Sequence, residues 1–102
     1  MVFKVAMKII DADYPGWAEG RFYDAWGIEH IIQDKIPVFT NQAPDPSDSL
    51  VPLEGWVRCT FLNERISAEG KKVVTVSTEY PDHIESTAGL FEFDLPEDRI
   101  AP

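Results

Sequence analysis

The feature that most limits how this chain can fold is a pair of strand-like segments joined by a short turn. Residues 55–66 and 72–79 are rich in β-branched and aromatic residues, with apolar side chains at alternate positions. Residues 67–71 (SAEGK) lie between them, and Gly70 suits the left-handed position of a hairpin turn. We therefore predict an antiparallel hairpin over residues 55–79. Alternation places Val57, Cys59 and Phe61 on one face, and Trp56, Arg58, Thr60 and Leu62 on the other.

Two more segments show the same alternation, near the two ends of the chain. In residues 2–10, alternation places Phe3, Val5, Met7 and Ile9 on one face and Lys4 and Lys8 on the other. Residues 89–95 (GLFEFDL) alternate in the same way and end at Pro96. Residues 11–20 hold turn formers, including Pro15-Gly16. We predict a strand in each alternating segment and a turn over residues 11–20.

Residues 21–39 are open to two interpretations. As a hairpin, residues 21–23 lead out, 24–27 turn with Gly27 in a left-handed conformation, and 28–33 return. As a helix, the isoleucines from Ile28 to Ile36 have near-helical spacing and Asp24 would cap its start. Pro37 restricts Ile36 to an extended backbone. We favour the hairpin, with Val38 and Phe39 extending or continuing the return strand.

The proline-rich segment that follows is the longest predicted loop. Residues 40–54 hold Pro44, Pro46 and Pro52 among Asp and Ser residues. Two halves separated at this point would each be too small to fold alone, so we predict one domain over residues 1–102. Short strands without a long helix predict a mostly β fold. The expected architecture is a five- or six-stranded antiparallel barrel or strongly bent sheet.

Charge limits the partners that this chain can have. Its net charge is −9, and Lys71-Lys72 is its only adjacent basic pair. Phosphate backbones require clustered positive charge, so the sequence argues against nucleic-acid binding. The acids are concentrated from Glu79 onward, where Arg99 is the only residue of the lysine and arginine type. Such an excess serves solubility, or it steers the chain toward a basic protein partner.

The sequence also bears on location. Cys59 is the only cysteine, so no internal disulfide can form and nothing indicates an oxidising compartment. Lys4 and Lys8 interrupt the apolar residues at the start, and no apolar run approaches the ~18 residues of a membrane span. We expect a cytoplasmic protein that does not insert into a membrane.

Two histidines are the first candidates for chemistry. On a strand His30 shares a face with Ile28 and Ile32, which suits either a core histidine with one hydrogen-bond partner or a general base lining a cavity. His83 lies in a turn between Asp82 and Glu85, so it is either an exposed turn residue or part of a mixed metal site. No spacing is typical of a metal site, and we expect neither a metal nor a cofactor. Cys59 is expected to be a buried, inert thiol.

The tryptophans offer a second kind of site. Trp17 and Trp26 fall in predicted turns, and Trp56 shares a strand face with Arg58. Tryptophan at the rim of a small core is one interpretation. The other is an exposed aromatic–arginine patch, because these residue types are enriched at interface hot spots. A face of this kind also suits a homodimer contact.

Three stretches resemble small uncharacterised bacterial proteins of similar length. They are Tyr23-Asp24-Ala25-Trp26-Gly27-Ile28-Glu29-His30, residues 34–40 (DKIPVFT) and residues 84–93 (IESTAGLFEF). The resemblance covers most of the chain from residue 20 onward. It implies a hairpin over residues 21–39 and provides no catalytic residues to carry over to this chain.

Two classes of function follow from these residues. The first is an acidic protein–protein interaction module, such as an inhibitor or an immunity-type partner, that uses Trp56 and Arg58. The second is a small-ligand-binding or enzymatic β-barrel with His30 in a pocket. Enzyme motifs are absent from the sequence, so we favour the interaction module.

Overall fold

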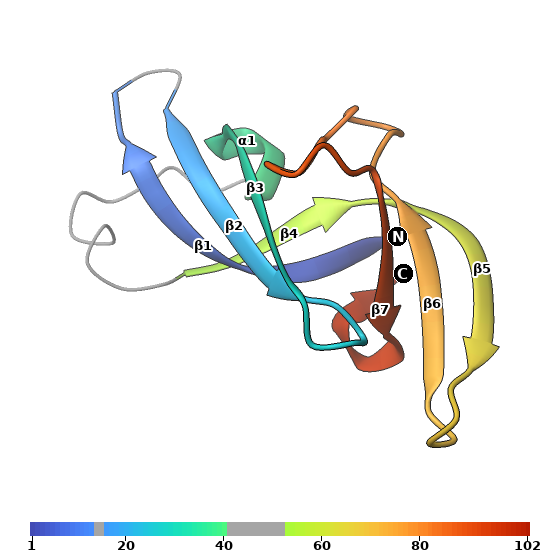
Figure 1. Cartoon of the computed structure of the whole chain (residues 1–102). Helices are drawn as coiled ribbons and strands as arrows, with labels where there is room; N and C mark the ends of the chain where they lie inside the picture. The colour runs from blue at the N-terminus through green and yellow to red at the C-terminus, as the bar shows by residue number, and fades with distance from the viewer. Residues whose placement is uncertain (14–15, 41–52) are drawn as a thin grey trace.

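Strands dominate the computed structural model, which describes residues 1–13, 16–40 and 53–102 (Figure 1). Strands account for 57% of the residues and helix for 8%, which confirms the prediction of a mostly β, antiparallel fold. The elements in chain order are β1 (Val2–Asp11), β2 (Trp17–Tyr23), β3 (Glu29–Lys35), α1 (Ile36–Phe39), β4 (Leu53–Arg58), β5 (Thr60–Ile66), β6 (Lys72–Ser77), β7 (Glu92–Pro96), η2 (Glu97–Arg99) and β8 (Ile100–Ala101).

The first sheet is centred on the strand predicted at residues 2–10. Its strand order is β3-β2-β1-β4, and the short β8 also pairs with β1. Burial along β1 alternates as predicted, with Phe3 and Val5 buried and Lys4 and Lys8 exposed. One face of this sheet therefore contributes to the core and the other carries charged side chains.

The hairpin over residues 21–39 is confirmed in its strands and its turn. β2 and β3 pair from Trp17↔Lys35 to Tyr23↔Glu29, and Gly27 has a φ of +80° at the turn. β2 begins at Trp17, within the turn predicted for residues 11–20, because β3 is long enough to pair with it.

The end of this hairpin differs from the prediction. Residues 36–39 form the helical turn α1 instead of extending the strand. Pro37 lies in the first turn, where the missing N–H is not needed. The helical turn also buries both Ile36 and Phe39.

The second sheet begins where the strand predicted at residues 55–66 breaks. β4 pairs with β1, whereas β5 pairs with β6 in the order β5-β6-β7, so the chain changes sheets at Cys59. The Cys59 N–H donates to the Met1 carbonyl at this corner. A bulge between Phe61 and Asn63 shifts the register again. Every residue of β5 is exposed, and Phe61 is 47% exposed, although alternation predicts it on the same face as the buried Val57 and Cys59.

The sequence predicts five or six strands in a barrel or a strongly bent sheet, and the structure differs in the number of strands and does not confirm the barrel. The described residues hold eight strands, and neither sheet formed by them closes into a barrel. Of the loop predicted at 40–54, residues 41–52 lie outside the described residues, and Leu53 and Glu54 belong to β4. The last strand starts at Glu92 instead of residue 89, because the Gly89 N–H donates to the Ser86 carbonyl in a turn.

One hydrophobic core joins the two sheets. Its centre is a cluster of rings, in which Phe22 contacts Phe3 with centroids 4.9 Å apart and Phe93 with centroids 5.1 Å apart. Phe3 and Phe22 come from the first sheet and Phe93 from β7 of the second. The packing brings the turn between β2 and β3 against β7, where the Ala25 N–H donates to the Asp94 carbonyl (Figure 1).

Candidate functional site

The turn between β2 and β3 is organised by the carboxylate of Asp24. Its Oδ1 accepts hydrogen bonds from the backbone N–H groups of Trp26 (2.8 Å) and Ile28 (2.9 Å). The Asp24 N–H donates to the Ile28 carbonyl, which closes the turn. Aspartate is suited to this position because its short side chain reaches the backbone two residues further on. The result is a turn whose backbone is fixed by one side chain.

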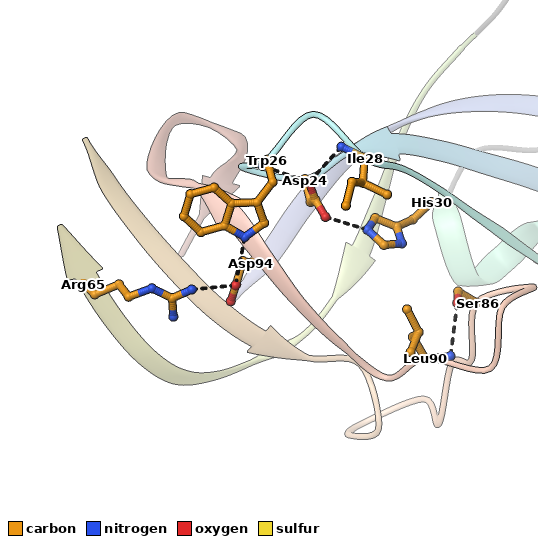
Figure 2. A network of polar contacts seen from close by, with 8 residues as sticks. All are labelled: Asp24, Trp26, Ile28, His30, Arg65, Ser86, Leu90 and Asp94. Atoms are coloured by element: carbon orange, nitrogen blue, oxygen red, sulfur yellow. Dashed lines mark hydrogen bonds and ion pairs between the residues drawn. The ribbon is translucent and has the colours of Figure 1, made fainter. Parts of the chain in front are cut away.

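The second oxygen of Asp24 binds His30. His30 Nε2 lies 2.8 Å from Asp24 Oδ2, and the side chains of the two residues are only 10% and 8% exposed (Figure 2). The imidazole stacks on Phe22 with ring centroids 5.3 Å apart, and it forms a T-shaped contact with Phe93 with ring centroids 5.0 Å apart. An ionised Asp24 favours the tautomer with the proton on Nε2. His30 therefore ties the turn to the ring cluster of the core.

Asp94 on β7 collects three side chains from distant parts of the chain. Its carboxylate accepts hydrogen bonds from Trp26 Nε1 (3.1 Å), Arg65 Nη2 (2.7 Å) and Thr75 Oγ1 (2.6 Å). Burial raises the pKa of Asp94, but the bonds from Thr75, Trp26 and Arg65 outweigh it, so the pKa lies below its ordinary value. The Ala25 N–H donates to the Asp94 carbonyl as well, so both side chain and backbone hold the turn on β7.

These contacts hold the Trp26 side chain in place at the surface of the protein. The residue is 50% exposed while its indole N–H is bound to Asp94, and the Arg65 guanidinium lies 5.6 Å from the ring centroid (Figure 2). A pocket of about 190 Å³ adjoins it, with walls from Ala25, Ala68, Val73 and Pro96. We call Trp26, Arg65 and this pocket the Trp26 surface. It is an aromatic–arginine surface built by three segments far apart in the sequence.

The predicted pair of Trp56 and Arg58 lies on β4, on the outer face of the first sheet. Trp56 is partly buried and lies beneath the Lys4 ammonium, which is 5.6 Å from its ring centroid. Arg58 is exposed, but its guanidinium makes a two-point contact with Asp82. Hydrogen bonding to Asp82 raises the pKa of Arg58 above its ordinary value. The two side chains thus share a face, and each has a charged partner of its own.

The remaining predicted residues lie apart from this surface. His83 is exposed in its turn with a φ of +52°, and its ring is 4.9 Å from that of Phe91, whereas His30 packs against Phe22 and Phe93. Cys59 is buried, and desolvation raises its pKa to about 11. A thiol with that pKa is almost wholly protonated near neutral pH, so it is a poor nucleophile.

Two further observations concern metals and membranes. Within residues 1–13, 16–40 and 53–102, no group of three or more His, Cys, Asp or Glu side chains is placed to hold a metal ion. The helices of this described part are also too short to cross a bilayer.

Sequence reasoning missed the residues that build the Trp26 surface. Asp24 was considered only as a helix cap or turn residue, and Arg65, Thr75 and Asp94 only as members of strands. The spacing Asp24-Ala25-Trp26-Gly27 does carry a local signal for a side-chain-capped turn. The contacts to Asp94 carry none, because they depend on how the two sheets pack.

Comparison with known proteins adds no family to this description. No protein-family model matches the chain, and no solved structure matches it closely enough to be informative.

Proposed function

We propose that this chain is a protein–protein interaction module that binds a basic protein, as an inhibitor or immunity-type partner does, with the Trp26 surface at the centre of the contact. The observation that carries the proposal is that Trp26 is half exposed and yet fixed by Asp94, Arg65 and the Asp24 turn. Tryptophan and arginine are the residue types that dominate interface hot spots. A ring that is already held in place loses little conformational entropy on binding.

The charge of the chain supports a basic partner. The exposed carboxylates of Glu79, Glu85, Glu92, Glu97 and Asp98 form no ion pair with any residue that the structure describes. They belong to the acidic part of the sequence that begins at Glu79, in a chain with a net charge of −9. Carboxylates of this kind attract a cationic partner and raise its association rate.

Trp56 and Arg58, which the sequence predicts to form the contact with a partner, are less suited than Trp26 to the centre of that contact. Arg58 is already bonded through two nitrogens to Asp82, so a partner would have to displace that contact to use it. Trp56 is partly covered by Lys4. We assign Trp56 and Arg58 to a second face of the module, outside the central contact.

The test combines capture from a native lysate with calorimetric titration of the purified captured protein. We expect a stoichiometric complex with a protein of net positive charge, whose Kd increases as NaCl is raised. Trp26→Ala should weaken the complex by about 30-fold, which is the effect of a hot-spot truncation of ~2 kcal/mol.

Trp17→Ala is the matched control, because Trp17 is also exposed, at 42%, but lies on the first sheet. It should change the Kd by less than about threefold. Circular dichroism establishes that both variants are folded. The proposal would be contradicted if no stoichiometric partner is captured or if the two substitutions weaken the complex equally. It would also be contradicted if the chain binds a second copy of itself instead of a basic protein.

The second candidate function is ligand binding or catalysis at His30. The Asp24–His30 contact favours it, because a carboxylate that orients an imidazole is the arrangement used by general bases. A metabolite mixture should then raise the Tm of the native chain and not that of a folded His30→Asn variant. If His30→Asn instead unfolds the chain, His30 serves the core.

A further inference from the structure

The pocket beside Trp26 is lined mostly by apolar side chains, which suit a small apolar ligand. Trp26, Val73 and Pro96 line it together with Ala25 and Ala68, so most of its wall is apolar. A dry cavity of about 150 Å³ is large enough to bind benzene. At about 190 Å³, this pocket has room for one six-membered ring with a short substituent. Its tryptophan offers an aromatic surface for that ring to pack against.

Two lysines line the pocket and contribute its positive charge. Lys71 and Lys72 both line it, and Lys72 is occupied by Glu64 at 3.0 Å. Lys71 forms no ion pair with any described residue, so its ammonium is available to a ligand.

The backbone of Lys71 is held at the neck of the β5–β6 turn. Its N–H donates to Ser67 Oγ, and its carbonyl accepts from the Ser67 N–H at 2.7 Å. Glu69, the acid of this wall, lies nearer the tip of the turn, next to Gly70 with its φ of +81°. The backbone of Lys71 is therefore fixed at the wall of the pocket.

We infer that the Trp26 pocket binds an aromatic ring that carries a carboxylate, with the ring packed between Trp26 and Pro96 and the carboxylate paired with Lys71. This inference goes beyond the proposed protein partner, because the ligand is bound by the chain alone. The same chemistry has two sources, a free aromatic acid or the C-terminal aromatic residue of a peptide.

The experiment follows the fluorescence of Trp26 in a chain that carries Trp17→Phe and Trp56→Phe, so that Trp26 is the only indole left. Phenylacetate is titrated into this protein, and phenethylammonium, which has the same ring and the opposite charge, is titrated in parallel. We expect saturable binding of phenylacetate with a Kd on the order of 1 mM. Phenethylammonium should bind at least about threefold more weakly.

Two variants test the role of Lys71. Lys71→Met keeps the length of the side chain and removes its charge, and it should weaken phenylacetate about two- to fivefold, as expected for an exposed ion pair. Lys35→Met is the matched control, because Lys35 also lacks an ion pair among the described residues and lies on β3, and it should leave the Kd unchanged.

N-acetyl-Gly-Phe separates the two sources of the ligand, since tighter binding than that of phenylacetate identifies a peptide C-terminus and weaker binding a free acid. No saturable change with phenylacetate up to 20 mM (about 20 times the expected Kd), stronger binding of phenethylammonium, or an equal effect of the two lysine substitutions would each overturn the inference. None of these results requires the protein partner, so a failure here is distinct from a failure of the interaction proposal.

Discussion

Two tryptophan–arginine pairs among the described residues differ in how they are held, and of these two the pair of Trp26 and Arg65 forms a fixed exposed surface. Trp56 and Arg58 are two residues apart on β4, so the strand itself places them on one face. Trp26 lies in the turn between β2 and β3 and Arg65 lies on β5 of the second sheet, and they meet because both bind Asp94. Proximity along a strand left Arg58 free to pair with Asp82, whereas a shared carboxylate holds Arg65 beside the Trp26 ring. The shared bonds to Asp94 therefore hold Trp26 and Arg65 together, although the two residues are far apart in the sequence.

The largest effect expected from breaking this arrangement is that of Asp24→Ala. The substitution removes the acceptor for the N–H groups of Trp26 and Ile28 and the partner of the nearly buried His30. We expect the free energy of unfolding to fall by about 2 to 3 kcal/mol, because buried polar groups lose their bonds. Urea unfolding followed by circular dichroism measures this loss.

Asp82→Ala is the matched control on the other pair, since Asp82 binds the exposed guanidinium of Arg58. Surface ion pairs contribute little, so its cost should stay below about 1 kcal/mol. If Asp24→Ala is no more costly than Asp82→Ala, then the Asp24 turn is not what fixes Trp26.

A smaller, pH-dependent effect is expected from Asp94→Asn. The pKa of Asp94 is lowered below the ordinary 3.8 in the folded chain, where its bonds to Thr75, Trp26 and Arg65 outweigh the effect of burial. The ionised group therefore stabilises the fold fully above pH 3.8, and this stabilisation is lost as the pH falls through the lower, folded pKa. Asp94→Asn should cost about 1 to 2 kcal/mol at pH 7.

The same substitution should cost progressively less below pH 3.8, and this convergence with the native chain is the signature of Asp94. Unfolding free energies of both proteins between pH 2.5 and 7, a range that brackets the titration of a carboxyl, would show it. A cost that stays constant over the whole range would mean that the carboxylate charge contributes nothing to the Trp26 surface.

How much of this was predictable from sequence depends on the range of each contact. The alternation of β1, the turn at Gly70 and the hairpin around Gly27 rest on local patterns, and each was predicted. The change of sheets at Cys59 was not, because a strand that leaves one sheet for another keeps its local composition. The Trp26 surface could not be predicted from the sequence for a related reason. Trp26 and Asp94 are 68 positions apart, and no pattern tells which carboxylate an indole N–H will reach.

The smallest expected effect compares the two arginines directly. Arg65→Ala and Arg58→Ala each remove an exposed guanidinium and one ion pair, so each should lower the free energy of unfolding by less than about 1 kcal/mol. The two should differ in what happens to tryptophan. Arg65→Ala removes the cation next to the Trp26 ring and should shift the emission of that indole, whereas Arg58→Ala should leave Trp26 unchanged.

The measurement is the emission spectrum of Trp26 in the chain that carries Trp17→Phe and Trp56→Phe, with and without each arginine substitution. Raising NaCl to 1 M should reproduce little of the Arg65→Ala shift, because that guanidinium is also hydrogen-bonded to Asp94 and is screened less than a free charge. Equal spectra for the two variants would show that Arg65 does not order Trp26. The difference between the two pairs would then rest on Asp94 and the Asp24 turn alone.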